Sequence, residues 1–232
     1  QQNLPGKSGG FPLSQALNNP GTDWWDLATQ RGFNQSHNVS VTQNIGKFGL
    51  YGSLNYSNNN SYIVGNDFTR YGALLNVDYK VMKDLTIGVK GQYSEGVSNL
   101  LNNAWNGGLG LAMSTGLPYY PVYNADGSFF RTDGFGTTWD FGGGNNLVAQ
   151  RESSDYRTYE KRGIAGMNLS YRGIKNLTIT ASGQYEQSNN FWYGFRNAWI
   201  LNRPANNPGL AEESRDKYTN YWLNATANYN WQ

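Results

Sequence analysis

Apolar and polar residues alternate with a period of two through most of this chain. Between residues 48 and 56, Phe48, Leu50 and Leu54 take one set of alternate positions, and Ser53 and Asn55 lie between them. The same alternation recurs at residues 39–45, 71–79, 85–93, 165–171, 177–185 and 221–231. Successive side chains of a strand point to opposite faces, so the pattern predicts seven β-strands. Residues 23–31 are the candidate for an eighth.

The composition excludes several other classes of protein. Only 15% of the residues are charged, whereas an ordinary soluble domain carries about a quarter. The 232 residues include 29 Gly and 31 Asn, which are poor helix formers, so a helical bundle is excluded. An aromatic content of 15% argues against disorder, and a net charge of +2 gives no basic field for nucleic acid. The chain has no Cys, which removes disulfides and thiol chemistry. An all-β protein is expected.

The connections between the predicted strands have two lengths that alternate along the chain. Short ones are expected at residues 44–47, 81–84 and 173–176, and long ones at about 57–69, 95–155 and 199–215. Tight turns at one end of an antiparallel meander and long loops at the other are typical of an outer-membrane β-barrel. In such a barrel the turns face the periplasm and the long loops face outside.

The apolar face of these strands could pack into a soluble core or face lipid. Its residues are mostly Leu, Val, Ala and Gly, with Tyr near the strand ends, as in the aromatic girdles of membrane barrels. The other face carries Asn, Thr, Ser and Gln, whereas a soluble sandwich would show more Lys and Glu. The pattern favours an antiparallel transmembrane barrel over a soluble β-sandwich or β-solenoid.

One stretch of the chain occurs twice. Residues 76–93 align without gaps with residues 168–185, and nine of the eighteen positions are identical. Each copy contains one short turn and the strand segments on both sides of it. We therefore predict one hairpin used twice.

Several segments resemble the start of the barrel in SusC/RagA-like TonB-dependent outer-membrane transporters. The segments are residues 22–26, 37–41, 51–56, 68–71, 75–81, 120–128 and 146–149. The last is similar to an Asn-Pro-Val-Ala segment of the family, with Leu147 in place of the usual Pro. No single motif is specific, but their order and spacing are, and they cover most of residues 20–190.

The resemblance implies a role in transport. Members of the family have an N-terminal plug inside a barrel of about 22 strands. They import oligosaccharides or peptides with energy from the TonB complex, and a SusD-like surface lipoprotein closes over the barrel as a lid. Here residues 1–21 would be a linker or the end of the plug, and residues 22–232 would form seven or eight strands of a larger barrel in the bacterial outer membrane. No TonB box is recognisable, and the transported substrate is not specified by these residues.

The long connection at 95–155 is the candidate binding region, because loops of that length are usually functional or disordered. Its aromatic side chains could contact substrate, dock the lid lipoprotein or pack on one another. The candidates are Trp105, Tyr119, Tyr120, Tyr123, Phe129, Phe130 and Trp139. Within this region, residues 124–127 (Asn-Ala-Asp-Gly) predict a hairpin turn rather than a calcium loop.

No pattern of catalytic or cofactor-binding residues is present. His37 is the only histidine, so a catalytic dyad or a transition-metal site is not expected. We expect His37 to form a hydrogen bond near a strand end instead. The three glycines at 142–144 lack the Lys and Ser/Thr of a phosphate-binding loop. We therefore predict a protein that is not an enzyme and uses no cofactor. The alternatives to a transporter segment are a complete small outer-membrane barrel with a structural or adhesive role, and a soluble carbohydrate-binding β-sandwich.

Overall fold

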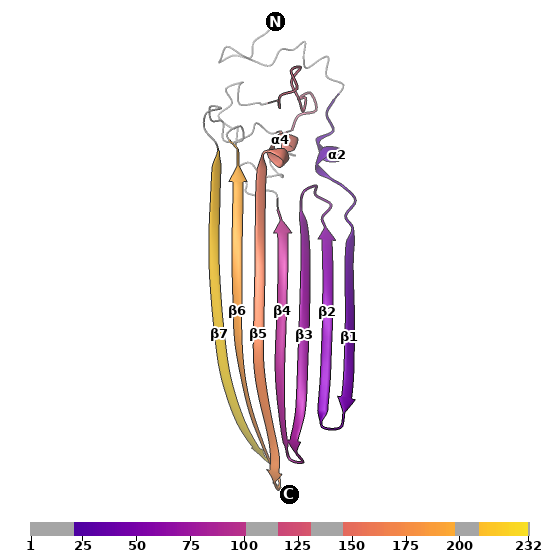
Figure 1. Ribbon diagram of the computed structural model, residues 1–232. Coiled ribbons are helices and arrows are strands. Elements are labelled where there is room, and N and C mark those ends of the chain that lie inside the picture. Colours follow the sequence, from indigo (N-terminus) through magenta and orange to yellow (C-terminus); the bar gives the residue numbers. More distant parts are fainter. Residues whose placement is uncertain (1–20, 101–115, 131–145, 198–208, 232) are drawn as a thin grey trace.

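The computed structural model describes residues 21–100, 116–130, 146–197 and 209–231. Its seven strands form one antiparallel sheet in chain order (Figure 1). They are β1 (Asn34–Ile45), β2 (Phe48–Asn60), β3 (Asp67–Met82), β4 (Leu85–Asn99), β5 (Ser154–Ile174), β6 (Leu177–Arg196) and β7 (Leu210–Tyr229). The predicted all-β meander is thus confirmed.

The three predicted tight turns all lie at one end of the sheet, at the bottom of Figure 1. Two of them contain a residue with positive φ: Gly46 at 58° and Asn176 at 62°. Gly and Asn are the residue types that best tolerate this left-handed region. Each turn also carries one exposed lysine, Lys47, Lys83 or Lys175. The described parts of the long connections lie at the opposite end.

The predicted bounds of the long loops, 57–69, 95–155 and 199–215, are wrong because the strands continue further. The connection between β2 and β3 contains only residues 61–66, and β7 already begins at Leu210. Polar residues continue the ladder here because backbone pairing needs no apolar side chain. Their side chains also join across the strands: Asn58 Nδ2 donates to Thr69 Oγ1 at 2.8 Å, and Asn99 Nδ2 donates to Asp67 Oδ1 at 2.9 Å.

The eighth strand predicted at residues 23–31 is also wrong, because this segment contains the short helix α2 (Trp24–Ala28). Asp23 is its N-cap, and the Asp23 side chain accepts a hydrogen bond from the backbone N–H of Asp26 at 2.9 Å. Burial of Trp24 fixes the helix against the loops. A single β-bridge between Thr29 and Ile63 is the only strand-like pairing described in this segment.

The repeated hairpin is confirmed by the pairing of the strands. Asn76 pairs with Lys90 in the first copy, and Asn168 pairs with Ser182 at the equivalent positions of the second. Both copies also shift register just before the turn, between Lys80 and Met82 and between Tyr171 and Ile174. The two sequences therefore fold into the same local structure.

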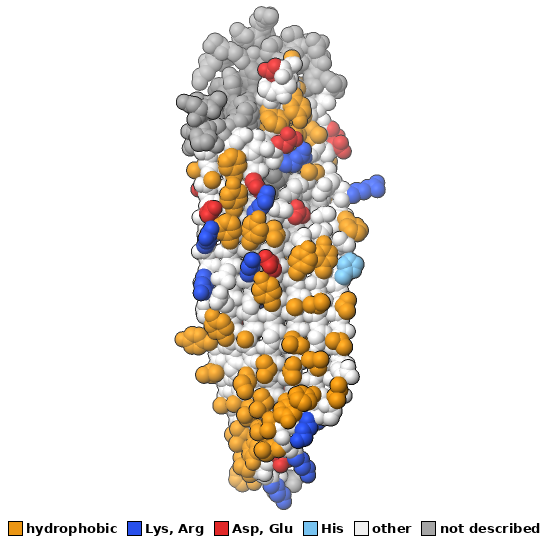
Figure 2. All heavy atoms as spheres, viewed as in Figure 1, with side chains coloured by type: hydrophobic (Ala, Val, Ile, Leu, Met, Phe, Trp, Pro, Cys, Tyr) orange, Lys and Arg blue, Asp and Glu red, His pale blue; other side chains and the backbone are white. Residues whose placement is uncertain are grey.

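The strands place their apolar side chains on one face of the sheet, which we call the outer face. Val39, Leu54, Ala73 and Tyr93 lie side by side across β1 to β4. Most of this face is open: Val39 is 71% exposed and Leu223 on β7 is 88% exposed. Figure 2 shows this face, with apolar side chains over its middle and lower parts and charged side chains above and at the lower tip. Such a surface matches the lipid-facing band of a transmembrane barrel.

Aromatic side chains border this apolar band at both ends. Towards the loops, Tyr56 and Tyr71 lie 5.1 Å apart between ring centroids. Towards the turns, Phe48 stacks on Tyr79 at 4.5 Å, and Tyr229 contacts Trp231 edge-on at 5.4 Å. Amphipathic rings at these two levels are the girdles expected at membrane interfaces.

A second helix, α4 (Leu147–Glu152), precedes β5 at the loop end of the sheet. Among the described residues, neither helix has the length and apolar character needed to cross a membrane.

Candidate functional site

The loop end of the sheet carries a small packed unit, which we call the loop cluster. It consists of α2, α4 and residues 116–130. Its buried centre is Trp24, Ala28 and Leu147, which are 5%, 1% and 2% exposed. Partly buried side chains pack around them: Leu27, Ile63, Tyr120 and Val122. Because α4 leads directly into β5, this unit is held on the rigid barrel wall.

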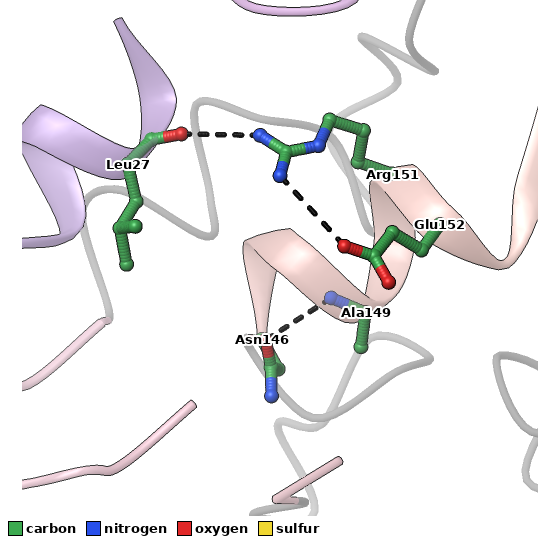
Figure 3. Close-up of polar contacts among 5 residues, drawn as sticks. All are labelled: Leu27, Asn146, Ala149, Arg151 and Glu152. Carbon is green, nitrogen blue, oxygen red and sulfur yellow. Dashed lines mark hydrogen bonds and ion pairs between the residues drawn. The ribbon is translucent and has the colours of Figure 1, made fainter. Parts of the chain in front are cut away.

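Asn146 joins α4 to the rest of the loop cluster. Its side chain is 1% exposed, and its Oδ1 accepts from the backbone N–H of Ala149 at 3.1 Å, which caps the helix (Figure 3). The Nδ2 group of the same side chain donates to the carbonyl oxygens of Val122 at 2.7 Å and Phe130 at 3.0 Å. One buried amide therefore fixes both sides of the 122–130 hairpin against the helix.

Residues near α2 are bound to a segment almost a hundred residues later. The backbone N–H of Thr22 donates to Pro118 O at 2.7 Å, and Trp24 Nε1 donates to Leu117 O at 3.1 Å. On the other side of the helix, Arg151 Nη1 donates to Leu27 O at 3.3 Å, and Arg151 lies 3.9 Å from Glu152 (Figure 3). These bonds fix the loop cluster without an extensive core.

The predicted turn at residues 124–127 is confirmed. Tyr123 and Phe129 form a β-bridge, and Gly127 at the tip has φ of 83°. Asp126 Oδ1 accepts from the Ser128 hydroxyl at 2.6 Å and from the Ser128 backbone N–H at 2.9 Å. These two hydrogen bonds favour the charged carboxylate, so they lower the pKa of Asp126 below its ordinary value.

Five of the seven predicted aromatic residues lie within the described residues, and they contact one another. Tyr119 meets Tyr120 edge-on at 4.7 Å, Tyr120 lies 5.4 Å from Phe130, and Tyr123 stacks on Phe129 at 5.3 Å. Phe130 is buried, but Tyr119 and Tyr123 are 41% and 48% exposed. These two rings are therefore partly open at the loop end of the sheet. Trp105 and Trp139 lie outside the described residues.

The sequence did not identify the residues that organise the loop cluster. The sequence pattern predicts a strand at Trp24, although Asp23 with a following helix-compatible segment is an N-cap signal. Asn146 stands out in the sequence only as part of a segment that resembles the family. Its contacts with Val122 and Phe130 join positions 24 and 16 residues apart, and no local pattern reveals them.

The inner face of the sheet is polar and partly charged. Arg162 pairs with Glu186 at 2.7 Å, and Arg70 Nη2 donates to Ser94 Oγ at 3.4 Å. Asn76 Oδ1 is buried without a hydrogen-bond partner in the described part of the chain. This face has the character of a wall that meets water, a plug or a substrate rather than lipid.

The single histidine lies on the edge strand β1. His37 Nε2 is 3.3 Å from Gln35 Oε1, and its ring stacks on Tyr56 at 6.2 Å. This agrees with the predicted hydrogen bond. Within the described ranges, no three His, Cys, Asp or Glu side chains lie together in a way that could hold a metal ion.

Comparison with known proteins gives one curated relative. No family model matches the chain. The TonB-dependent receptor P26 of Formosa agariphila is 27% identical over 166 residues, which cover 70% of this chain and 16% of that receptor. The chain therefore spans about a sixth of the length of the curated relative that it matches.

Solved structures share the fold. The RagAB peptide transporter aligns with a TM-score of 0.69 and 14% identity over 91% of this chain and 24% of that one. The RagAB peptide importer in its closed-closed and open-open states gives TM-scores of 0.67 and 0.68 at 15% identity, over 92% and 89% of this chain and 24% and 23% of those chains. The chain is therefore similar in sequence to part of a TonB-dependent receptor, and its sheet shares the fold of part of the RagAB peptide transporter structures.

Proposed function

We propose that the chain forms part of the wall and outer mouth of a transporter that imports a nutrient, either an oligosaccharide or a peptide. The single observation that carries the proposal is the loop cluster, which holds exposed tyrosines on a rigid unit at the loop end of the sheet. A nutrient arriving from outside meets that end first. The names of the curated relative and of the RagAB structures support this role.

In this proposal the wall performs no covalent chemistry and requires no cofactor. The outer face holds the protein in lipid, and the polar inner face borders the import path. Energy enters through the TonB complex and the plug of the family, for which residues 1–21 would be the linker or final part. The transporter is therefore not an enzyme.

Lid contact is the role we assign to the exposed rings of the loop cluster. Tyr119 and Tyr123 are amphipathic rings at the outer mouth, and side chains of this kind are enriched in protein interfaces. A SusD-like lipoprotein would close on this rim and retain the nutrient between lid and barrel. The RagAB peptide importer, known in 'closed-closed' and 'open-open' states, supports a part that closes over the barrel.

The experiment compares the full-length protein with a Tyr119→Ala/Tyr123→Ala variant. Membranes are solubilised, the transporter is purified, and co-purified lipoprotein is quantified by mass spectrometry. The variant should retain several-fold less lipoprotein, because truncation of central aromatic contacts typically costs about 1–2 kcal/mol or more. Tyr62→Ala is the control, since Tyr62 is 62% exposed near the same end of the sheet but outside the ring contacts.

Uptake provides the second arm of the experiment. Cells lacking the transporter should lose uptake of a labelled oligosaccharide or peptide mixture, and cells lacking TonB should lose the same uptake. Equal uptake in all strains would contradict the transport role. Equal recovery of lipoprotein with the Tyr119→Ala/Tyr123→Ala variant and with the Tyr62→Ala control would contradict the lid contact but not the transport role.

Neither alternative gains support from the fold. A soluble sandwich needs a second sheet over the apolar face, and the described strands all belong to one sheet. In a complete small barrel the first and last strands would pair, but among the described residues β1 pairs only with β2 and β7 only with β6.

A further inference from the structure

The outer face contains a groove of about 910 Å³ that crosses β1 to β6. Its volume is within the range of about 300–1,000 Å³ that is usual for small-molecule sites. The larger side chains that line it include Leu54, Leu75, Tyr93 and Tyr185. Small residues lie between them: Gly52, Ala73, Gly91, Gly163 and Ala165.

Two of these glycines have no evident conformational or packing reason to be glycine. A Cβ atom at Gly91 or Gly163 would have no other atom within 4 Å, and neither residue has a positive φ. By contrast, a Cβ atom at Gly183 on the same face would lie 2.7 Å from Leu223 Cδ2. Glycine in a strand interior weakens the strand and often marks close approach of a ligand. The effect of Gly91 and Gly163 is to leave the groove open.

The groove has an apolar body and a polar upper end. At the end nearest the loops, Lys161 Nζ lies 3.1 Å from Glu95 Oε1, and the Tyr93 hydroxyl donates to Glu95 at 3.2 Å. Beside them the Tyr185 hydroxyl donates to Gln187 at 3.0 Å, and Gln187 Nε2 lies 3.4 Å from Asn189 Oδ1. Lys161, Gln187 and Asn189 all line the groove. An amphiphile would match this division, with a hydrocarbon chain below and a polar head above.

We propose that this groove binds one acyl chain of an outer-leaflet membrane lipid, with the lipid head at Lys161 and Asn189. The groove opens on the apolar band that already faces lipid, so the bilayer is the medium in contact with it. Its polar end lies towards the long loops, which is the outer side of the membrane in a barrel with short periplasmic turns. Acyl chains are held there by close packing, because lipid offers no hydrophobic gain over the surrounding tails.

The test uses the full-length protein and lipid A, the acylated part of lipopolysaccharide. The protein is delipidated in detergent, titrated with lipid A and examined by native mass spectrometry. The Gly91→Val/Gly163→Val variant fills the groove with side chains that extended strands accept well. We expect its affinity for the first bound lipid to fall by about fivefold, the order of a packing contribution of about 1 kcal/mol.

An Ala225→Leu/Ala227→Leu variant is the matched control, because it adds apolar bulk to the same face outside the groove. It should bind the first lipid as the wild type does. Unchanged binding by the valine variant, or an equal loss in both variants, would overturn the proposal. If the double valine variant does not fold, the single variant Gly163→Val is tested, and its affinity for the first bound lipid should fall by about twofold. Unchanged affinity in that variant would also overturn the proposal.

Discussion

Asn146 is the residue on which the arrangement of the loop cluster depends most. Its amide makes three hydrogen bonds from a position that is 1% exposed. Loss of that amide removes the cap from the Ala149 N–H and takes one hydrogen bond from each of the carbonyl oxygens of Val122 and Phe130, of which Val122 O keeps its bond from the Phe130 N–H. Buried polar groups without partners are costly, so a local effect on the loop cluster is expected rather than an effect on the sheet.

Asn146→Ala should lower the free energy of opening the loop cluster by about 1–3 kcal/mol. Hydrogen–deuterium exchange of the full-length protein measures this, and exchange should accelerate at Ala149 and Phe130, whereas the amides of β3 and β4 stay protected. Asn228→Ala, at an exposed strand position, is the control. Unchanged exchange at Ala149 would contradict the role given to Asn146.

Asp126 makes the 124–127 turn sensitive to pH. Its folded pKa is lowered by the two hydrogen bonds from Ser128, so the charged carboxylate stabilises the turn. This contribution is present above the unfolded pKa of about 3.9 and is lost as the pH falls through the lower folded value. The Ser128 amide should therefore exchange relatively faster below about pH 4 than a strand amide does, after correction for intrinsic rates. Asp126→Asn should remove this pH dependence, and persistence of the dependence in that variant would contradict the assignment.

Among the elements, the strands were largely predictable from sequence and their ends were not. Alternation predicts a strand wherever one face is apolar, as in Leu85 to Tyr93 of β4. The polar extensions carry no such signal: Asn58 and Thr69 belong to strands because their backbones and side chains pair across β2 and β3. The α2 helix has only its Asp23 cap as a local signal, and distant contacts such as the hydrogen bond from Trp24 to Leu117 also stabilise its five residues.

The repeated hairpin is a part of the fold whose strand pairing could be predicted from the sequence. Both copies form equivalent pairs over residues 76–79 and 168–171, and both shift register before the turn, because the shared residues lie in the turn and its flanking strands. The groove, in contrast, extends beyond the repeat. Gly91 lies in the first copy, on β4, but Gly163 lies on β5 before the second copy begins, and only the register brings them to neighbouring rows of the outer face.

The start of β7 provides a test at this scale. Gly209 has φ of 100°, and a Cβ atom there would collide with the backbone carbonyl oxygen of Arg196 and lie 2.8 Å from Asn197 Cα. Gly209→Ala should therefore lower the free energy of unfolding by about 1–3 kcal/mol. Gly91→Ala should be neutral or slightly stabilising, because its Cβ atom meets open space. Urea unfolding of the full-length protein in lipid vesicles measures both, and equal stability of the two variants would contradict this explanation.

At the scale of the whole molecule, the sheet separates two environments. The outer face has exposed Leu, Val and Tyr bordered by aromatic rings, and the inner face has Asn, Ser, Lys and Arg. A soluble protein would cover the first face with a second layer. We therefore expect lipid to cover it instead, because the described strands form a single sheet and the chain is similar to a TonB-dependent receptor.

The most direct measurement of this separation uses two adjacent residues of β4. These 232 residues contain no cysteine, so Val89→Cys and Lys90→Cys variants of the full-length protein, with any cysteine outside them replaced by serine, can each carry one nitroxide label in lipid vesicles. Val89 lies on the outer face and Lys90 on the inner face. At position 89 we expect the label to collide more often with dissolved oxygen than with a water-soluble nickel chelate, and at position 90 we expect the reverse order. The same preference at both positions, or the opposite order, would contradict this expectation.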